Sequence, residues 1–348
     1  MAARTVGIKD VAAAAGVSVT TVSHVLNDVP HTRTSEETKD RIRAAAESLG
    51  YRPNRLARGL RTQTSEMVGL VTEEIATTPY AGQIILGAQE AATSRNLALA
   101  IINASLNREP EVAPDEIRSL LERHVDGIIY ATVFHDEVVP PAEMRKSPSV
   151  LIGARDAKGE IPSVVPDERA GAASVVGMLT GLGHRRIAFL ASSVDVPATR
   201  GRAVGYAEAM ADAGLDTRGL VVEGDSEAGG GYAAALVALN RPVDVRPTAV
   251  FCYNDRMAMG AYRAAAELGL RIPDDVSIVG FDDQAPLPRS LFPALTTVAL
   301  PHYDMGAWAL NTLADQIAGH AENRLLASHP TLLKCPIVAG DSVSVPKA

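Results

Sequence analysis

Polar residues that can hydrogen-bond a small ligand follow several short apolar runs in the second part of this chain. Arg202, Asn254 and Asp282 have the largest hydrogen-bonding capacity. A guanidinium offers a rigid fork of donors, a carboxylate accepts from two neighbouring hydroxyls, and an amide does both. Such a set suits a polar or polyhydroxylated ligand. Two aromatic residues, Tyr80 and Phe134, follow other apolar runs of the same kind.

These residues need a scaffold that brings strand ends together, and the apolar runs predict one. Helical stretches of ten or more residues separate most of the runs, which is typical of parallel sheets in an α/β fold. The predicted strands are Met67–Val71, Ala98–Ile102, Val125–Tyr130, Val150–Ile152, Ile187–Ala191, Leu220–Val222, Ala249–Tyr253 and Ser277–Phe281. They form two similar sets, which predicts two lobes. Ligands of open parallel sheets bind beyond the carboxyl ends of the strands, so we expect the polar residues to lie there.

The first 52 residues predict a bundle of three helices. The spacing of apolar residues predicts helices at about 8–15 and 19–26, separated by a turn at Gly16. A capping-box pattern beginning at Thr34 predicts a third helix, which ends at Gly50. Two short helices around a glycine turn are the layout of an all-α helix-turn-helix, although an ordinary bundle of alanine-rich helices would share the pattern.

Small hydrogen-bonding side chains cover the exposed face of the second predicted helix, which Ser18 caps. Thr20 and His24 lie opposite the apolar side, and Thr21 and Ser23 flank them. The His24 ring can donate to N7 or O6 of guanine, whereas an exposed threonine is by default a solvated helix residue. This face therefore predicts contacts with base edges in the major groove of DNA.

The segment 53–61 predicts a helix that forms only against DNA and a second copy of itself. Three arginines interleave with apolar residues, but the segment is short and contains Gly59, and isolated helices below about 12–15 residues are unstable. Leu60 lies close to Arg58 and Arg61, which makes it a candidate wedge for a minor-groove base step.

The distribution of charge favours DNA binding by the first part of the chain. The whole chain has 33 Lys and Arg against 41 Asp and Glu, a net charge of −8. Residues 1–62 hold ten basic and six acidic residues, so this part carries +4 and the remainder −12. A basic head on an acidic body concentrates phosphate attraction at one end and keeps the body off nucleic acid.

Several classes of protein are disfavoured. There is no run of 18 apolar residues, and the two cysteines, Cys252 and Cys335, lie in apolar surroundings, so we expect a cytoplasmic protein without disulfides. The apolar stretch after Lys9 could imitate a signal peptide, but it is short and abuts Asp10. A phosphate loop with lysine, a GxSxG elbow, paired CxxC motifs and HExxH are all absent, so we expect no enzyme, catalytic residue, cofactor or metal. A sugar-binding transport protein is the main rival, but it would lack the basic head and carry a secretory signal.

The chain resembles the lactose/galactose repressor (LacI/GalR) family, with a head and hinge closest in style to its purine-responding members. The segments that carry the resemblance are IKDVAAAAGVSVTTVSHVLN, YRPNRLARGLR, GHRRIAFL, RGRAVGY, AVFCYNDRMAMGA, RIPDDVSIVGFDD and PALTTV. The resemblance spans the whole chain. It implies a transcription repressor that binds a pseudo-palindromic operator in double-stranded DNA as a homodimer, under the control of a small effector, most simply a sugar. The effector would bind between two lobes of a periplasmic-binding-protein-like core.

The resemblance also assigns roles to individual residues. The residues implied to bind DNA are Ser18, Thr20, Thr21, Ser23, His24, Asn27, Arg58, Leu60 and Arg61. The residues implied to bind the effector are Tyr80, Phe134, Arg202, Asn254 and Asp282, with Asp167 as a further candidate. Each has a structural alternative: Asp282 could cap the next segment, Arg202 could pair with an acid of its own helix, and Asn254 could brace a turn.

Three positions depart from the family pattern. Gly7 stands where family members usually have a threonine that caps the first helix, and glycine caps less well. Gly153 stands where many sugar-responding members have a carboxylate, and Asp156 lies three residues later. Ser226 replaces the aromatic residue of purine-responding members, which makes a purine ligand doubtful.

The resemblance implies three regions: a DNA-binding domain over 1–52, a hinge helix and linker over 53–65, and a core over 66–348. Within the core we expect an N-lobe of about 66–166 and 299–327 and a C-lobe of about 167–298 and 328–348. The sequence shows no leucine-heptad segment after the core, so we expect a dimer rather than a tetramer.

Overall fold

The chain divides into two compact units, Met1–Ser65 and Glu66–Ala348. The computed structural model describes residues 6–27, 29, 33–51, 64–73, 75, 82–104, 114–319 and 329–347, and only the backbone of 133–136. The predicted hinge helix, with Arg58, Leu60 and Arg61, lies outside the described residues, as does Tyr80. Among the described residues no helix is long and apolar enough to cross a membrane.

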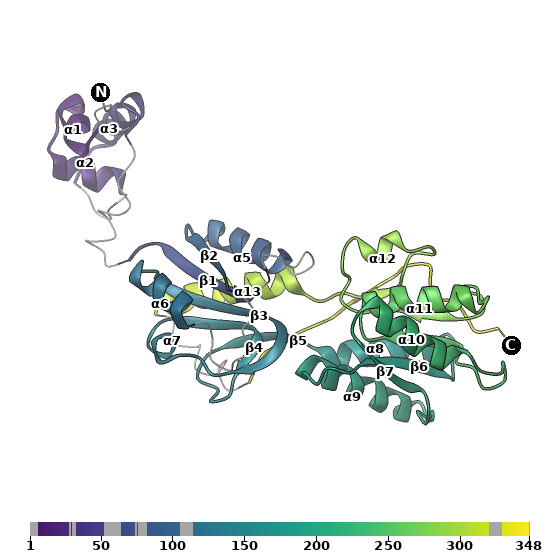
Figure 1. The fold of residues 1–348 in the computed structure, drawn as a ribbon. Coiled ribbons are helices and arrows are strands. Elements are labelled where there is room, and N and C mark those ends of the chain that lie inside the picture. The colour runs from purple at the N-terminus through teal and green to yellow at the C-terminus, as the bar shows by residue number, and fades with distance from the viewer. Residues whose placement is uncertain are drawn as a thin grey trace. The chain divides into compact units, whose positions relative to one another are not determined.

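The described residues of the first unit form three short helices, drawn in purple in Figure 1, around a small apolar core. They are α1 (Ile8–Ala15), α2 (Val19–Leu26) and α3 (Glu36–Ser48). Each helix contributes a fully buried side chain to the core: Val11, Val22 and Ile42. Gly16 ends α1 with φ +66°, a left-handed conformation that a glycine adopts without strain. The prediction of a helix-turn-helix with a third closing helix is confirmed.

The same cap begins both α2 and α3. Ser18 Oγ accepts from the backbone N–H of Thr21 at 3.1 Å, and Ser35 Oγ accepts from that of Thr38 at 3.3 Å. In each pair the two hydroxyls are also hydrogen-bonded. The third helix is therefore capped by Ser35, one residue after Thr34, where the capping-box pattern placed the start.

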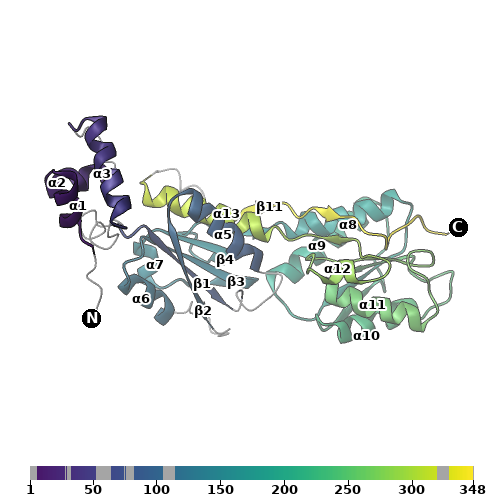
Figure 2. The same ribbon diagram turned by 90° about the horizontal axis from the view of Figure 1, so that it is seen from above.

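The first sheet of the second unit is parallel and has six strands in the order β11-β5-β4-β3-β1-β2. Its strands are β1 (Met67–Glu73), β2 (Ala98–Ala104), β3 (Gly127–Val138), β4 (Ser149–Asp156), β5 (Ser163–Pro166) and β11 (Thr331–Leu333). Helices α5 (Gly82–Ser94) and α13 (His302–Ile317) cover one face, and α6 (Pro114–Glu122) and α7 (Ala142–Lys146) cover the other (Figures 1 and 2). Each face has its own apolar core, because the strands are buried on both sides.

The second sheet is also parallel, with four strands in the order β7-β6-β8-β9. Its strands are β6 (Ile187–Ser192), β7 (Val221–Gly224), β8 (Ala249–Cys252) and β9 (Ser277–Val279). The helices of this lobe are α8 (Glu168–Gly181), α9 (Pro197–Asp212), α10 (Ala228–Leu239), α11 (Asp255–Glu267) and α12 (Leu287–Ser290). A small antiparallel pair, β10 (Thr297–Val298) with β12 (Ile337–Val338), lies outside both sheets. The two predicted sets of parallel strands are thus present.

Two segments differ from the sequence-based expectation. Thr331–Leu333 falls within the predicted C-lobe segment 328–348, but it forms β11 and pairs with β5 in the first sheet. Strand β3 continues to Val138, so Phe134 lies inside that strand and not after it. A bulge between Ala131 and Asp136 lets β3 resume its pairing with β4 beyond the apolar run, which hydrophobicity alone could not reveal.

Candidate functional site

Helix α2 presents a polar face to solvent. Val22 and Val25 turn inward, while Thr20 is exposed and Thr21, Ser23 and His24 are partly exposed. Short side chains with hydroxyl and imidazole groups on one helix face are suited to reading base edges. The structure therefore places the predicted contact residues of this helix together on one face.

Two predicted DNA-contact residues also hold the ends of α2. Ser18 caps the N-terminus through Thr21, as described above. Asn27 Nδ2 donates to the carbonyl of Ser23 at 2.7 Å, at the C-terminus of the helix. At the start of α1 the glycine departure is partly compensated, because the Gly7 N–H donates to Asp10 Oδ2 at 2.8 Å.

Arg202, on α9, is the centre of a buried cluster in the second lobe. The side chain is 3% exposed. Its Nε donates to Glu168 Oε2 at 2.7 Å, and Nη2 donates to Glu168 Oε1 at 3.3 Å. Nη1 donates to the carbonyl of Tyr253 at 2.5 Å, and Nη2 lies 2.8 Å from Asp282 Oδ1. Arg202 thus pairs with acids, but they come from α8 and from the loop after β9, not from its own helix.

Aromatic rings also enclose the Arg202 guanidinium. Its central carbon lies 3.8 Å from the centroid of the Phe281 ring and 4.6 Å from that of Tyr253. Burial alone would lower the pKa of Arg202, but the charges of Glu168 and Asp282 outweigh it and raise that pKa above its ordinary value. The guanidinium is therefore a fixed positive charge.

Asp282 lies in a backbone conformation that is unusual for its type. Its φ is +97°, in the region that favours glycine, and such a conformation costs on the order of 1–3 kcal/mol. Its Oδ2 accepts from Gln284 Nε2 at 2.8 Å. Among the described residues, none has a donor aligned for a hydrogen bond on the buried Oδ1, because the nearby Arg202 nitrogen is close but poorly directed. Strain and an acceptor without an aligned donor are typical of a binding site.

Asn254 is buried and both ends of its amide are used inside the protein. Oδ1 accepts from the N–H of Met257 at 2.8 Å, which caps α11, and Nδ2 donates to the carbonyl of Ser226 at 2.9 Å. The bracing role that the sequence left open is therefore present. Asp167 has a similar role, because it caps α8 by accepting from the N–H of Ala170 at 3.0 Å.

Two acidic residues of this region were not among the predicted ligand contacts. Glu168 is buried beside Arg202, and burial raises the pKa of its carboxyl while the guanidinium offsets part of that shift. Asp255, also buried, accepts from Thr297 Oγ1 at 2.5 Å and from the N–H of Gln284 at 2.7 Å. Burial, together with the charge of Asp282, raises the pKa of Asp255 to about 8. Both residues begin helices, so the sequence shows them only as ordinary first-turn acids.

Many sugar-responding family members have a carboxylate where this chain has Gly153. Asp156, three residues later in the first sheet, does not take its place. This residue is buried and accepts two hydrogen bonds of 2.9 Å from the guanidinium of Arg145 and two more from backbone N–H groups. Gly153 has φ +63°, and a Cβ there would lie 2.7 Å from the carbonyl oxygen of Thr132. A side chain at position 153 would be strained and crowded. The side chain of Phe134 lies outside the described residues.

Comparison with known proteins identifies the same two parts. Residues 7–54 match the family described as bacterial regulatory proteins, lacI family, and residues 176–343 match a periplasmic binding protein-like domain. Catabolite control protein A of Priestia megaterium is 35% identical over 314 residues, covering 88% of this chain and 91% of that protein. The HTH-type transcriptional repressor PurR of Serratia proteamaculans is 34% identical over 337 residues, covering 95% and 96%.

Solved structures agree over nearly the whole chain. The lac repressor dimer bound to operator and the anti-inducer ONPF has a TM-score of 0.76 at 26% identity and covers 98% of this chain and 100% of its own. The complex of the transcriptional regulator CelR with cellobiose has a TM-score of 0.63 at 28% identity, with coverage of 97% and 99%. PurR and the lac repressor are named as repressors, and CelR is named as a transcriptional regulator. The chain therefore belongs to the LacI family of bacterial regulatory proteins, as the sequence resemblance predicted, and is a DNA-binding transcription regulator.

Proposed function

We propose that this regulator is a repressor whose binding to a pseudo-palindromic operator is controlled by a small polar effector. The observation that carries the proposal is the buried cluster of Arg202, Glu168 and Asp282, with an acceptor oxygen that lacks an aligned donor. Such a cluster beyond the strands of an open parallel sheet is where ligands bind. The effector would bind here, in a cleft between the two lobes, and a sugar fits the hydrogen-bonding capacity of the cluster.

The DNA-binding part of the proposal rests on the polar face of α2. Thr20, Thr21, Ser23 and His24 would meet base edges in the major groove, while the ends of the helix are held by Ser18 and Asn27. Arg58, Leu60 and Arg61 of the predicted hinge would contact the minor groove at the operator centre.

A homodimer is part of the same proposal. Phe292, in the loop after α12, is 98% exposed, and aromatic side chains are enriched in interfaces between protein chains. A dimer would hold two heads at successive major grooves, and pairing of two copies would order the segment 53–61. Effector binding would then make or melt this hinge, because it shifts the equilibrium between two arrangements of the lobes.

The test begins with selection of DNA from a random library by the full chain. We expect a palindromic consensus, and binding to it is then measured by fluorescence anisotropy with and without each member of a sugar panel. At least one sugar should shift the operator affinity; a loss of affinity defines an inducer and a gain defines a corepressor. A chain that selects no palindrome, or whose operator affinity no small molecule changes, would refute the proposal.

A further inference from the structure

Arg202 has almost no hydrogen-bonding capacity left for a ligand. It is the only lysine or arginine among the described residues that is fully buried. Both of its edges face acids or a carbonyl: Nε and Nη2 face Glu168, Nη1 faces Tyr253 O, and Nη2 also lies beside Asp282. The rings of Phe281 and Tyr253 lie within 3.8 and 4.6 Å of its central carbon. Arg202 is therefore already paired, and it is the one cation among the described residues of this cluster that a ligand with a negative charge could meet.

The same cluster has an excess of acceptors. Arg202 contributes one positive charge, and the carboxylates of Glu168 and Asp282 contribute two negative charges, so the cluster has a net charge of −1. Glu168→Gln would remove one of these negative charges and leave the cluster neutral. Asp282 Oδ1 is buried without an aligned donor. A ligand group that donates a hydrogen bond satisfies this oxygen, whereas a phosphate or carboxylate oxygen would face it with like charge.

We propose that Glu168 sets the charge class of the effector: the site takes a ligand without negative charge that donates hydrogen bonds to Asp282, such as an unmodified sugar, and excludes phosphorylated and carboxylated sugars. This inference rests on the proposed function, because it assumes that the cluster is the effector site. Glu168 acts by neutralising Arg202 and is therefore a specificity-determining residue. Removal of its charge should free the guanidinium for an anion.

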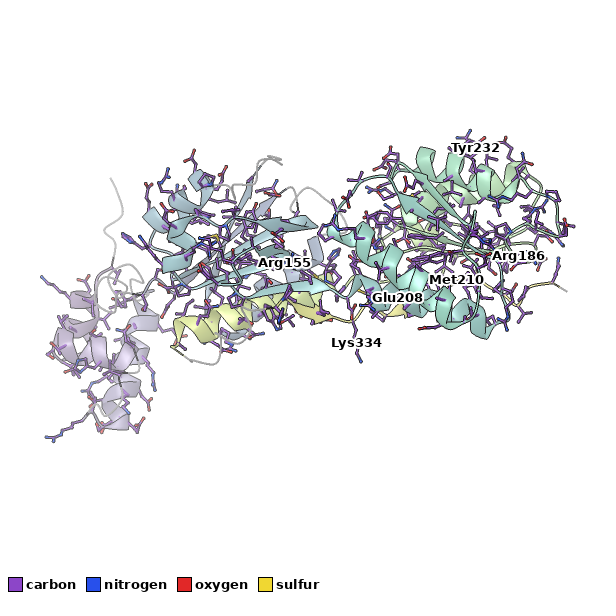
Figure 3. The ribbon with its side chains drawn as sticks, turned by 90° about the horizontal axis from the view of Figure 1, so that it is seen from below. Arg155, Arg186, Glu208, Met210, Tyr232 and Lys334 are labelled. Carbon is purple, nitrogen blue, oxygen red and sulfur yellow. The ribbon has the colours of Figure 1, made fainter. Side chains whose placement is uncertain are left out.

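The exposed pair of Arg169 and Glu208 provides a matched control. It joins the same two helices, α8 and α9, with hydrogen bonds of 2.6 and 2.7 Å, but at the surface, where Glu208 is about half exposed. Glu208 and the buried Met210, both labelled in Figure 3, belong to α9. Glu208→Gln therefore changes the net charge of the chain as Glu168→Gln does, without changing the charge of the cluster.

The experiment uses the full chain without DNA, so its result does not depend on operator binding, which is measured separately with the selected palindrome. Isothermal titration calorimetry is carried out with inorganic phosphate and with matched pairs: glucose and glucose 6-phosphate, ribose and ribose 5-phosphate, galactose and galacturonate. For the wild-type chain we expect no saturable phosphate binding, and any sugar that binds should do so at least roughly tenfold more tightly than its anionic counterpart. Glu168→Gln should bind phosphate measurably, and the difference in affinity between each sugar and its anionic counterpart should become smaller. Glu208→Gln should behave as the wild type does.

Three results would overturn the inference. The first is saturable phosphate binding by the wild-type chain, and the second is a preference of the wild-type chain for the anionic member of any pair. The third is that Glu168→Gln and Glu208→Gln bind phosphate and the sugars equally. If no sugar of the panel binds, the phosphate titrations decide alone. If Glu168→Gln does not fold by circular dichroism, Asp282→Asn replaces it, because it also removes one negative charge from the cluster; phosphate binding must then appear in Asp282→Asn and be absent from Glu208→Gln.

Discussion

The guanidinium of Arg145 holds the carboxylate of Asp156 with two hydrogen bonds of 2.9 Å, one to each oxygen. Asp156 is fully buried as a side chain, whereas Arg145 keeps some exposure and also pairs with the exposed Glu160. The acid nearest in sequence to the position of the missing sugar-binding carboxylate is thus committed to the fold of the first lobe. Its removal should affect stability and not ligand binding.

We expect Asp156→Asn to lower the free energy of unfolding by about 3 kcal/mol, because it leaves the Arg145 charge without its buried partner. Glu160→Gln is the control and should change stability by at most about 0.5 kcal/mol, since a partly exposed ion pair contributes little. Urea denaturation followed by circular dichroism measures both values. Equal effects of the two substitutions would show that the buried pair has no special role.

Two substitutions of Asn254 distinguish the contribution of the α11 cap to stability from that of the hydrogen bond to Ser226. Asn254→Ala removes both and should cost about 2–3 kcal/mol, from the lost cap and the unsatisfied carbonyl. Asn254→Ser retains a capping hydroxyl and should recover about 1 kcal/mol of that loss. Thermal denaturation of the two variants gives the comparison. If serine is no better than alanine, Asn254 does not stabilise the fold through its cap.

Much of the fold follows from patterns that are local in sequence. Alternation of apolar runs with helical stretches predicted both parallel sheets. In the head, apolar spacing around a glycine turn predicted the first two helices, and a capping-box pattern predicted the third. The predictions fail where the pattern depends on distant segments: β3 continues to Val138 through a bulge, and β11 pairs with β5 of the first sheet, which precedes it by more than 160 residues. Pairing between distant segments leaves little trace in a single sequence.

The candidate site shows the same limit. Arg202 and Asp282 were predicted because their residue types suit ligand binding at strand ends, and the structure brings them within 2.8 Å. Glu168 was missed, since it stands 34 positions from Arg202 on another helix and no spacing rule connects them. Asn254 was predicted as a ligand contact, but the chemistry that makes an amide useful to a ligand also makes it a helix cap.

Two substitutions in α2 distinguish a residue that stabilises the first unit from a residue that contacts DNA. Ser18→Ala removes the cap of α2 and should destabilise the first unit by about 1 kcal/mol. Thr20→Ala should leave stability unchanged, because the side chain is exposed, but should weaken operator binding by roughly tenfold or more if it contacts a base. Anisotropy with the selected operator and denaturation of the same proteins measure the two effects. Unchanged operator affinity in Thr20→Ala would remove this residue from the contact set.

Phe292 tests the proposed homodimer. Burying a phenylalanine contributes about 1.5–3 kcal/mol, so replacing it by a charged residue in each copy of a dimer should be strongly unfavourable. We expect Phe292→Asp to weaken the dimer in sedimentation velocity, with little change in the unfolding of the monomer, since the side chain is 98% exposed. The equally apolar Val243, which is 78% exposed in the loop after α10, serves as the control as Val243→Asp. A dimer that Phe292→Asp leaves intact would place the interface elsewhere.

The raised pKa of Asp255 predicts how stability depends on pH. Burial shifts it from 3.8 to about 8, so between these values the unfolded chain releases a proton that the folded chain keeps. Stability should therefore fall as pH rises through this window, by at most about 1.4 kcal/mol per pH unit from this group, and level off above it. The variant Asp255→Asn has no ionisable group at this position. It also changes the hydrogen bonds to Thr297 and Gln284, which shifts its free energy of unfolding by an amount that does not depend on pH. The difference in unfolding free energy between variant and wild type should consequently shift in favour of the variant from pH 4 to pH 8, because titrations of all other groups largely cancel. Urea denaturation measures the free energy of unfolding of both proteins at each pH. If the two free energies change in parallel from pH 4 to pH 8, Asp255 is ionised in the folded protein and stabilised by its two hydrogen-bond donors.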